Sequence, residues 1–322
     1  MDGFDTGIIA GKWLLNEGAL SASTRFGVGQ CLSLGSSTNL IKRIVPSSKV
    51  IVGYAWNPSG TYSNLGVINL FGDSGTVAHL TLKMPVAGSL SLMRGNDIGT
   101  QIATASIATS GWQYLEMSAT ISDTVGEVIV RVNGQVIINY TGDTRNGGTN
   151  TTIDTFSIVG ANGTKYYDDL YICDGTGTTN NTFLGDVRVQ TLMPNSAGSS
   201  TQFTPTGGAN YANVAEVTDS TATYNASSTV GNRDTYAMAD LSASTGPIYG
   251  VQNSIVAWKS DAGTGTIKTA LKAGASVYYD STIPLGTSSS LYLSPVREVN
   301  PATSTAWTVS DVNGAELGAE VA

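Results

Sequence analysis

The sequence predicts an all-β protein made of two β-sandwich domains of the jelly-roll type in tandem. The pair Asn133 and Gly134 lies between two runs in which apolar and polar residues alternate, and Asn-Gly accepts positive φ at both centres of a type I′ hairpin turn. The same rhythm recurs along the chain as short alternating runs separated by Gly, Asn, Asp or Ser clusters, which is typical of sandwiches and barrels. Gly accounts for 38 of 322 residues and charged residues for only 12%, a composition that favours turns and strands over long helices.

Strands are predicted around this hairpin and before it. Residues 112–117, 130–140 and 167–174 are interpreted as consecutive antiparallel strands. Four further strands are predicted before them, at residues 50–56, 66–71, 78–82 and 89–93.

The chain length predicts two domains. The first is placed at residues 1–190 and the second, smaller sandwich at 201–322, joined by a short linker at 191–200 that holds Pro194 and Gly198. Strands of the second domain are predicted at residues 250–258, 265–272, 290–293 and 306–313, and the terminal segment with Glu316 and Glu320 is expected to be mobile.

Charge and hydropathy exclude several partners. The formal net charge is −8 and the basic residues are scattered, so nucleic acid is not expected to bind. No run of 18 apolar residues predicts a membrane span, and the start of the chain lacks the pattern of a signal peptide. We therefore expect synthesis in the cytoplasm and no membrane insertion.

Catalysis would have to use a single histidine, His79. The tetrapeptide Gly-Asp-Ser-Gly at residues 72–75 resembles the nucleophile motif of trypsin-like proteases, with Ser74 close to His79. In those proteases the histidine and the acid lie far upstream of the serine, and nothing upstream can serve here. The tetrapeptide is better interpreted as a turn between strands, and His79 as a residue on a sheet face.

Glycoside hydrolysis needs two carboxylates about 5 to 9 Å apart. The adjacent Asp168 and Asp169 should point to opposite faces of a strand and so not form a pair. The glutamates Glu116, Glu127, Glu216 and Glu298 stand apart from other acids. No catalytic residue is predicted, and the chain is expected not to be an enzyme.

Metal and cofactor sites have little support in the sequence. Cys and His are too few for zinc, which leaves calcium bound by oxygen ligands. The candidate ligands are Asp168, Asp169, Asp174 and the loop at 143–148, but none has the spacing of a dedicated calcium loop, and solvated turn acids are the favoured interpretation. No cofactor is predicted. The two cysteines are Cys31 and Cys173, for which buried free thiols are favoured over a disulfide.

The aromatic composition is the remaining evidence for a binding site: the chain has 14 Tyr and 5 Trp but only 6 Phe. Tyr and Trp combine an apolar face with a polar tip, which suits sugar stacking and wet protein interfaces. The candidate ligand-binding residues are Tyr166, Tyr167, Tyr171, Tyr278 and Tyr279. Ordinary sandwich cores and edges also use Tyr freely.

Several segments of the chain resemble known families. The strands at 112–140 and 167–174 are similar to those of laminin-G-like and concanavalin-like jelly rolls. More narrowly, the chain resembles virion proteins of tailed bacteriophages at residues 2–5, 12–13, 25–29, 168–174, 183–188, 300–303 and 307–308.

The resemblance implies a structural virion protein without catalysis, assembled in the host cytoplasm. Its partners would be other phage virion proteins, further copies of itself as a homo-oligomer, and host surface glycan. Two roles stay open. One is an exposed tail component, a tail fibre or tail tip, that binds host glycans. The other is a capsid or tail decoration or connector protein that clamps neighbouring subunits without binding a ligand.

Overall fold

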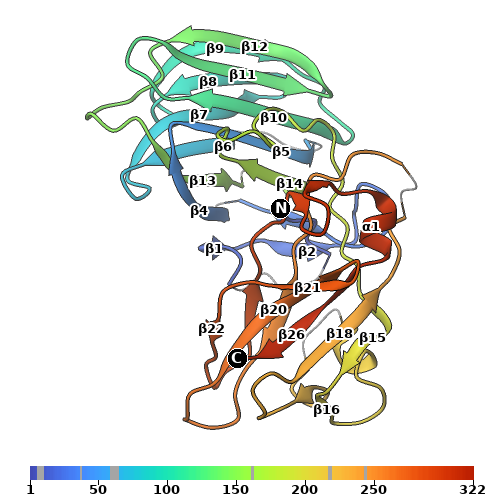
Figure 1. The fold of residues 1–322 in the computed structure, drawn as a ribbon. Coiled ribbons are helices and arrows are strands. Elements are labelled where there is room, and N and C mark those ends of the chain that lie inside the picture. Colours follow the sequence, from blue (N-terminus) through green and yellow to red (C-terminus); the bar gives the residue numbers. More distant parts are fainter. Residues whose placement is uncertain (6–10, 37, 59–64, 161–162, 217–219, 243–244) are drawn as a thin grey trace. The chain divides into compact units, whose positions relative to one another are not determined.

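The computed structural model describes the chain except residues 6–10, 37, 59–64, 161–162, 217–219 and 243–244. The chain divides into two compact units, which we describe separately. Unit 1 comprises residues 1–9 and 13–189, and unit 2 comprises residues 10–12 and 190–322. Both consist mainly of antiparallel strands (Figure 1), so the predicted all-β class with sandwich-like domains is confirmed. Within the described residues, no helix has the length and apolar character needed to cross a membrane.

Unit 1 is built from two seven-stranded sheets, here named sheets A and B. Sheet A has the order β1 (Leu15–Asn16), β4 (Asn39–Ser47), β13 (Ile153–Val159), β6 (Leu65–Gly72), β7 (Val77–Val86), β8 (Ser89–Arg94), β9 (Thr100–Ser106). Sheet B has the order β12 (Gln135–Gly142), β11 (Gly126–Val132), β10 (Gln113–Thr120), β5 (Lys49–Asn57), β14 (Lys165–Cys173), β3 (Cys31–Leu34), β2 (Ala19–Ser21).

The core of unit 1 follows the two-residue period of its strands. In β10, Leu115 and Met117 are buried in the main core together with Val52 of β5 and Val130 of β11. Alternate residues point to opposite faces of a strand, so Tyr114 and its outward neighbours on sheet B lie on the other side. A second, smaller apolar cluster forms there.

The predicted hairpin is confirmed at its turn. Asn133 and Gly134 have φ values of 49° and 78°, and Val132 of β11 pairs directly with Gln135 of β12. The turn is also fixed to β10, because the Tyr114 N–H donates to Asn133 Oδ1 at 2.8 Å and the Asn133 N–H donates to the Tyr114 carbonyl at 2.8 Å.

Strand β14 departs from the expected regular alternation. Its pairing with β5 shifts register between Asp168 and Tyr171, and Asp169 has a φ of 53°. The expectation that Asp168 and Asp169 point to opposite faces is therefore wrong. In the bulged strand the Asp169 N–H donates to Asp168 Oδ1 at 2.9 Å, and both side chains are buried.

Unit 2 contains a six-stranded sheet with a short edge and three two-stranded pairs. The main path runs β15 (Pro194–Thr201), β18 (Arg233–Met238), β26 (Glu316–Val321), β20 (Thr266–Ala273), β21 (Ser276–Tyr279), with β22 (Ile283–Pro284) also pairing with β20. The pairs are β16 (Thr204–Pro205) with β17 (Asn225–Ala226), β19 (Ser254–Ala257) with β23 (Ser290–Leu293), and β24 (Val299–Asn300) with β25 (Thr305–Ala306); a 3-10 turn spans Ala212–Val214.

The end of the chain differs from the prediction. The segment holding Glu316 and Glu320 forms β26, which pairs with β18 on one side and β20 on the other. Part of the predicted strand at 306–313 is the short helix α1 (Val309–Asn313), because Thr308 and Asp311 form a capping box. The predicted linker also contains a strand, since β15 pairs with β18.

Candidate functional site

The outer face of sheet B is covered by the chain itself. Tyr114 and Tyr171 lie on this face, are almost fully buried, and pack against Phe183 and Leu184. Their rings stack with centroids 6.5 Å apart. A segment at residues 183–189 therefore occupies the face on which a flat ligand could otherwise lie.

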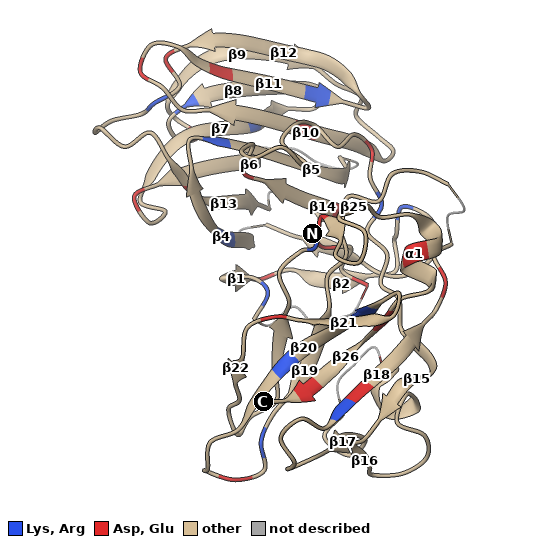
Figure 2. Cartoon of the chain, viewed as in Figure 1, with Lys and Arg blue, Asp and Glu red and all other residues tan. Residues whose placement is uncertain are grey.

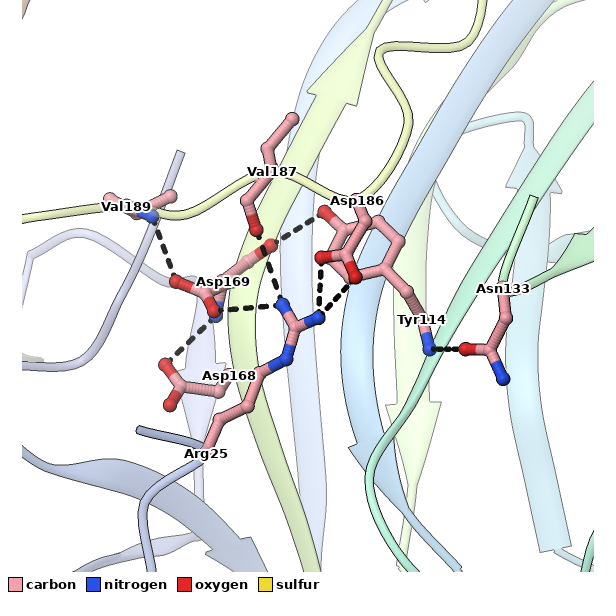
Figure 3. A network of polar contacts seen from close by, with 8 residues as sticks. All are labelled: Arg25, Tyr114, Asn133, Asp168, Asp169, Asp186, Val187 and Val189. Carbon is pink, nitrogen blue, oxygen red and sulfur yellow. Dashed lines mark hydrogen bonds and ion pairs between the residues drawn. The ribbon is translucent and has the colours of Figure 1, made fainter. Parts of the chain in front are cut away.

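Arg25 holds this covering segment in place (Figure 3). Its guanidinium contacts the Asp169 carboxylate at 3.3 Å and donates to the Val187 carbonyl at 3.3 Å. It also pairs with Asp186, and the Val189 N–H donates to Asp169 Oδ1 at 2.8 Å. The bulge of β14 thus places one buried carboxylate where it binds both an arginine and the backbone of the covering segment.

The same arrangement extends to β10 (Figure 3), because the Tyr114 hydroxyl donates to the Asp169 carbonyl at 2.9 Å. We call these contacts the Arg25 network; it comprises Arg25, Tyr114, Asn133, Asp168, Asp169, Asp186, Val187 and Val189. Burial and the neighbouring Asp169 charge raise the pKa of Asp168 to about 7. Burial also raises the pKa of Asp169, opposed by the Val189 N–H and by Arg25.

A second buried carboxylate lies under the covering segment. Glu116 Oε1 accepts hydrogen bonds from the Tyr171 hydroxyl at 2.6 Å and from the Gly185 N–H at 2.8 Å. Glu116 Oε2 is 3.9 Å from an Arg131 nitrogen, and the Arg131 guanidinium lies over the Phe183 ring. Through these contacts sheet B holds residues 183–187 against its outer face.

Some segments with the virion resemblance contact the β14 bulge or the covering segment. Asp2 pairs with Leu170 of the β14 bulge through two backbone hydrogen bonds of 2.8 Å, and Asp2 Oδ2 accepts from the Trp13 indole N–H at 2.8 Å. The Phe26 ring lies beside the Arg25 guanidinium and beside that of Arg188.

The five predicted tyrosines do not form one binding surface. Tyr167 and Tyr171 are 0% and 1% exposed, so their rings belong to the interior of unit 1, while Tyr166 is half-buried. Tyr278 and Tyr279 lie in unit 2 on β21, where the Tyr279 hydroxyl bonds to Arg233 and Glu320. Tyr279 is 36% exposed and therefore presents far more surface than Tyr167 or Tyr171.

The predicted calcium candidates are used in other contacts. Asp168 and Asp169 belong to the Arg25 network, and Asp174 Oδ1 accepts from the Thr176 N–H at 2.9 Å. Across the described ranges, no three His, Cys, Asp or Glu side chains are grouped so that they could hold a metal ion.

An open pocket of about 650 Å³ lies elsewhere in unit 1. Three segments line it, namely the β6–β7 turn, the β8–β9 turn and the loop after β12. We call it the loop pocket; its wall includes Phe71, Thr76, Arg94, Asn96, Ile98, Thr100 and Asn146. It combines hydroxyl, amide and guanidinium groups with an aromatic ring and with Ile98, which is 83% exposed.

Partly buried contacts fix the walls of the loop pocket. The Arg94 guanidinium pairs with Asp143. The Asn146 side chain donates to the Ala78 carbonyl at 2.9 Å, and the Asn146 N–H donates to His79 Nδ1 at 3.3 Å. Burial lowers the pKa of His79, which keeps the imidazole neutral and able to accept this hydrogen bond near pH 7.

The tetrapeptide at residues 72–75 forms the predicted turn. Asp73, Ser74 and Gly75 have φ values of 52°, 59° and 76°. The Ser74 and Gly75 N–H groups donate to the Asp154 carboxylate at 2.7 and 3.1 Å. His79 Nδ1 accepts a hydrogen bond from the Asn146 backbone N–H. The protease-like spacing of Ser74 and His79 therefore comes from a turn and the strand that follows it.

Sequence reasoning did not find the loop pocket. Its wall comes from three turns separated by up to about 75 residues, and only strand pairing brings them together. Two of the three segments carry signals in the sequence, the turn at 72–75 and the polar loop at 143–148. Nothing in either segment predicts that they share a pocket.

Comparisons with known proteins give only distant similarities. No protein-family model matches the chain, and no curated protein matches it. Similar solved structures include the carbohydrate-binding module CBM66 from Bacillus subtilis, at 9% identity, covering 50% of this chain and 94% of that one, with a TM-score of 0.35.

Two further similar structures have names that refer to carbohydrate. A mutant of the alginate lyase Aly36B in complex with alginate tetrasaccharide matches at 11% identity, covering 53% of this chain and 91% of that one, with a TM-score of 0.38. The carbohydrate recognition domain of Emp46p matches at 12% identity, 51% and 89% coverage, and a TM-score of 0.33. Every one of these TM-scores is below 0.5.

Proposed function

We propose that the chain is a non-catalytic protein that binds glycan through the loop pocket of unit 1. The observation that carries this proposal is the composition of the pocket wall, in which Asn96, Thr100 and Asn146 stand beside Phe71 and Ile98. Sugars present hydroxyl groups around apolar C–H faces, so they need both kinds of contact. The pocket is open and has a volume of about 650 Å³, so it would contact one side of a glycan and not enclose it.

The pocket favours a neutral sugar over an acidic one. Arg94 is the charged residue of the wall, and its guanidinium is paired with Asp143. A ligand carboxylate would have to compete with Asp143 for that guanidinium. A neutral hexose needs no such exchange and can use the amide and hydroxyl groups.

A panel of neutral and acidic oligosaccharides measured by titration calorimetry tests this proposal. Replacing Ile98 or Thr100 by Ala should weaken binding about tenfold, or ~1.4 kcal/mol, because Ile98 supplies an apolar contact and Thr100 a hydroxyl group of the wall. Val136→Ala is the matched control, because Val136 is 56% exposed and lies at the opposite end of β12 from the pocket loop. No binding to any sugar, or equal loss in the control, would contradict the proposal.

We also propose that the protein is an exposed component of a tailed-phage virion, a tail fibre or tail tip that contacts host surface glycan. The support is the resemblance of segments such as 2–5, 25–29 and 183–188 to phage virion proteins, together with the loop pocket. Gold-labelled antibody on intact particles should mark the tail, and labelling of the head would contradict this placement.

The absence of catalysis is part of the same proposal. It is supported by the positions of the buried carboxylates, since Glu116 and Asp169 bind the covering segment. Incubation with the best-bound polysaccharide should leave its viscosity unchanged. A progressive fall in viscosity would show cleavage and overturn this part.

A decoration or connector role is the second candidate. It is favoured by the free strand edges at one end of unit 1, which could pair with neighbouring subunits. Deletion of the gene would then reduce particle stability and leave adsorption unchanged, whereas loss of adsorption would favour the tail role.

A further inference from the structure

The long free edges of sheets A and B lie at the same end of unit 1. Strands β9 and β12 are the terminal strands of their sheets, and they lie against each other across the sandwich (Figure 1). The opposite edges are formed by β1 and β2, which have 2 and 3 residues. In the described part of the chain, no strand pairs with the outer edge of β9 or β12.

Neither edge strand carries a charge or a proline, and each shifts register once against its inner neighbour, at Ile137 in β12 and at Ile102 in β9. Soluble proteins protect exposed edges with charges, prolines or very short strands. Strand β9 has 7 residues and β12 has 8, and neither contains Lys, Arg, Asp, Glu or Pro (Figure 2). Two long edges without charges or prolines, side by side, favour pairing with another chain.

The hydrophobic core of unit 1 extends to these edge strands, where some of its side chains remain partly exposed. Ile102 and Ala105 of β9 and Ile137 and Tyr140 of β12 pack against the main core but are only partly buried. Val136 of β12 is 56% exposed. A partner at this end would complete the strand ladders and cover apolar side chains in the same step.

Electrostatics favours a second copy as this partner. The chain has a formal net charge of −8, so two copies repel each other over most approaches. An edge without charged residues is where two acidic molecules meet at the lowest electrostatic cost. An antiparallel pair of identical strands around a two-fold axis is also self-complementary.

We propose that the β12 edge is a homodimer interface, where β12 pairs antiparallel with β12 of a second copy. The adjacent β9 edges then face one another across the same two-fold axis. This pairing joins the two B sheets into one continuous sheet. It needs no glycan, although Thr100 of the loop pocket is also the first residue of β9.

Sedimentation velocity of the full chain over a range of concentrations tests the interface. The wild type should sediment as a species of twice the chain mass of 33.3 kDa. Val136→Lys and Asn139→Lys each place a charge on the edge and should give a monomer, because each copy would bring an unpaired positive charge into the same interface. Val45→Lys is the matched control, since Val45 is 78% exposed and lies on β4.

Thermal unfolding of each variant separates loss of pairing from loss of fold. The expected result is a dimeric wild type, a dimeric Val45→Lys variant and folded monomers for both β12 variants. A monomeric wild type at all concentrations would overturn the proposal. A dimer that persists in both β12 variants would place the interface elsewhere and overturn it equally.

Discussion

The protonation of Asp168 makes the stability of the Arg25 network depend on pH. Asp168 sits in the β14 bulge with its Oδ1 on the Asp169 N–H, and burial beside a second carboxylate raises its pKa to about 7. The native state therefore favours the protonated form. The raised pKa of Asp168 adds to the free energy of unfolding. This addition is fully present below the pKa of about 4 that the residue has in the unfolded chain, and it is lost as the pH rises through about 7.

Asp168→Asn should remove this pH dependence, because the amide oxygen can still accept from the Asp169 N–H and carries no charge. The variant should gain on the order of 2 kcal/mol over the wild type at about pH 8 and little at about pH 4. Denaturant unfolding at both pH values measures the difference. Asp97→Asn, which removes an exposed carboxyl, is the control, and a pH-independent difference for Asp168→Asn would contradict the assigned protonation.

The β11–β12 hairpin shows what a short motif determines. Asn-Gly predicts the turn, and both residues adopt positive φ with two-residue loop geometry. Strands β5, β6, β7, β8 and β10 also lie where the sequence predicts them. Strands β4, β9 and β13 were not predicted, and because β13 intervenes, β14 does not directly follow the hairpin as expected. Alternation fails where local hydrogen bonding intervenes, as at the capping box of Thr308 and Asp311 and at the β14 bulge.

Gly134→Ala should destabilise unit 1 by about 1 kcal/mol, because Gly134 has a φ of 78° that a Cβ disfavours. A Cβ there would meet no atom within 4 Å, so the effect is one of backbone conformation alone. Gly35→Ala is the matched control, since its Cβ also meets no atom within 4 Å and its φ is not positive. Equal effects in thermal unfolding would contradict the turn assignment.

The whole chain depends on pairings that sequence patterns do not reveal. Strand β26 at the end of the chain lies between β18 and β20, and its Glu316 carboxylate binds Lys272 at 2.6 Å and the Ser199 N–H at 2.7 Å. The loop pocket likewise depends on which strands become neighbours. The fold class was predictable because every strand contributes to it, whereas the position of the candidate site depends on a few long-range pairings.

Truncation after residue 315 removes β26 and should abolish the cooperative unfolding of unit 2, because β18 and β20 lose their shared neighbour. Calorimetry should then show the transition of unit 1 alone. Retention of the full wild-type heat absorption would contradict the central place of β26 in this sheet.

Hydrogen exchange with and without the best-bound glycan tests the central claim most directly. Binding at the loop pocket should slow exchange at residues 94–100 and 143–148 and leave residues 183–189 unchanged. Protection confined to β21, around Tyr278 and Tyr279, with no change at the loop pocket, would contradict it.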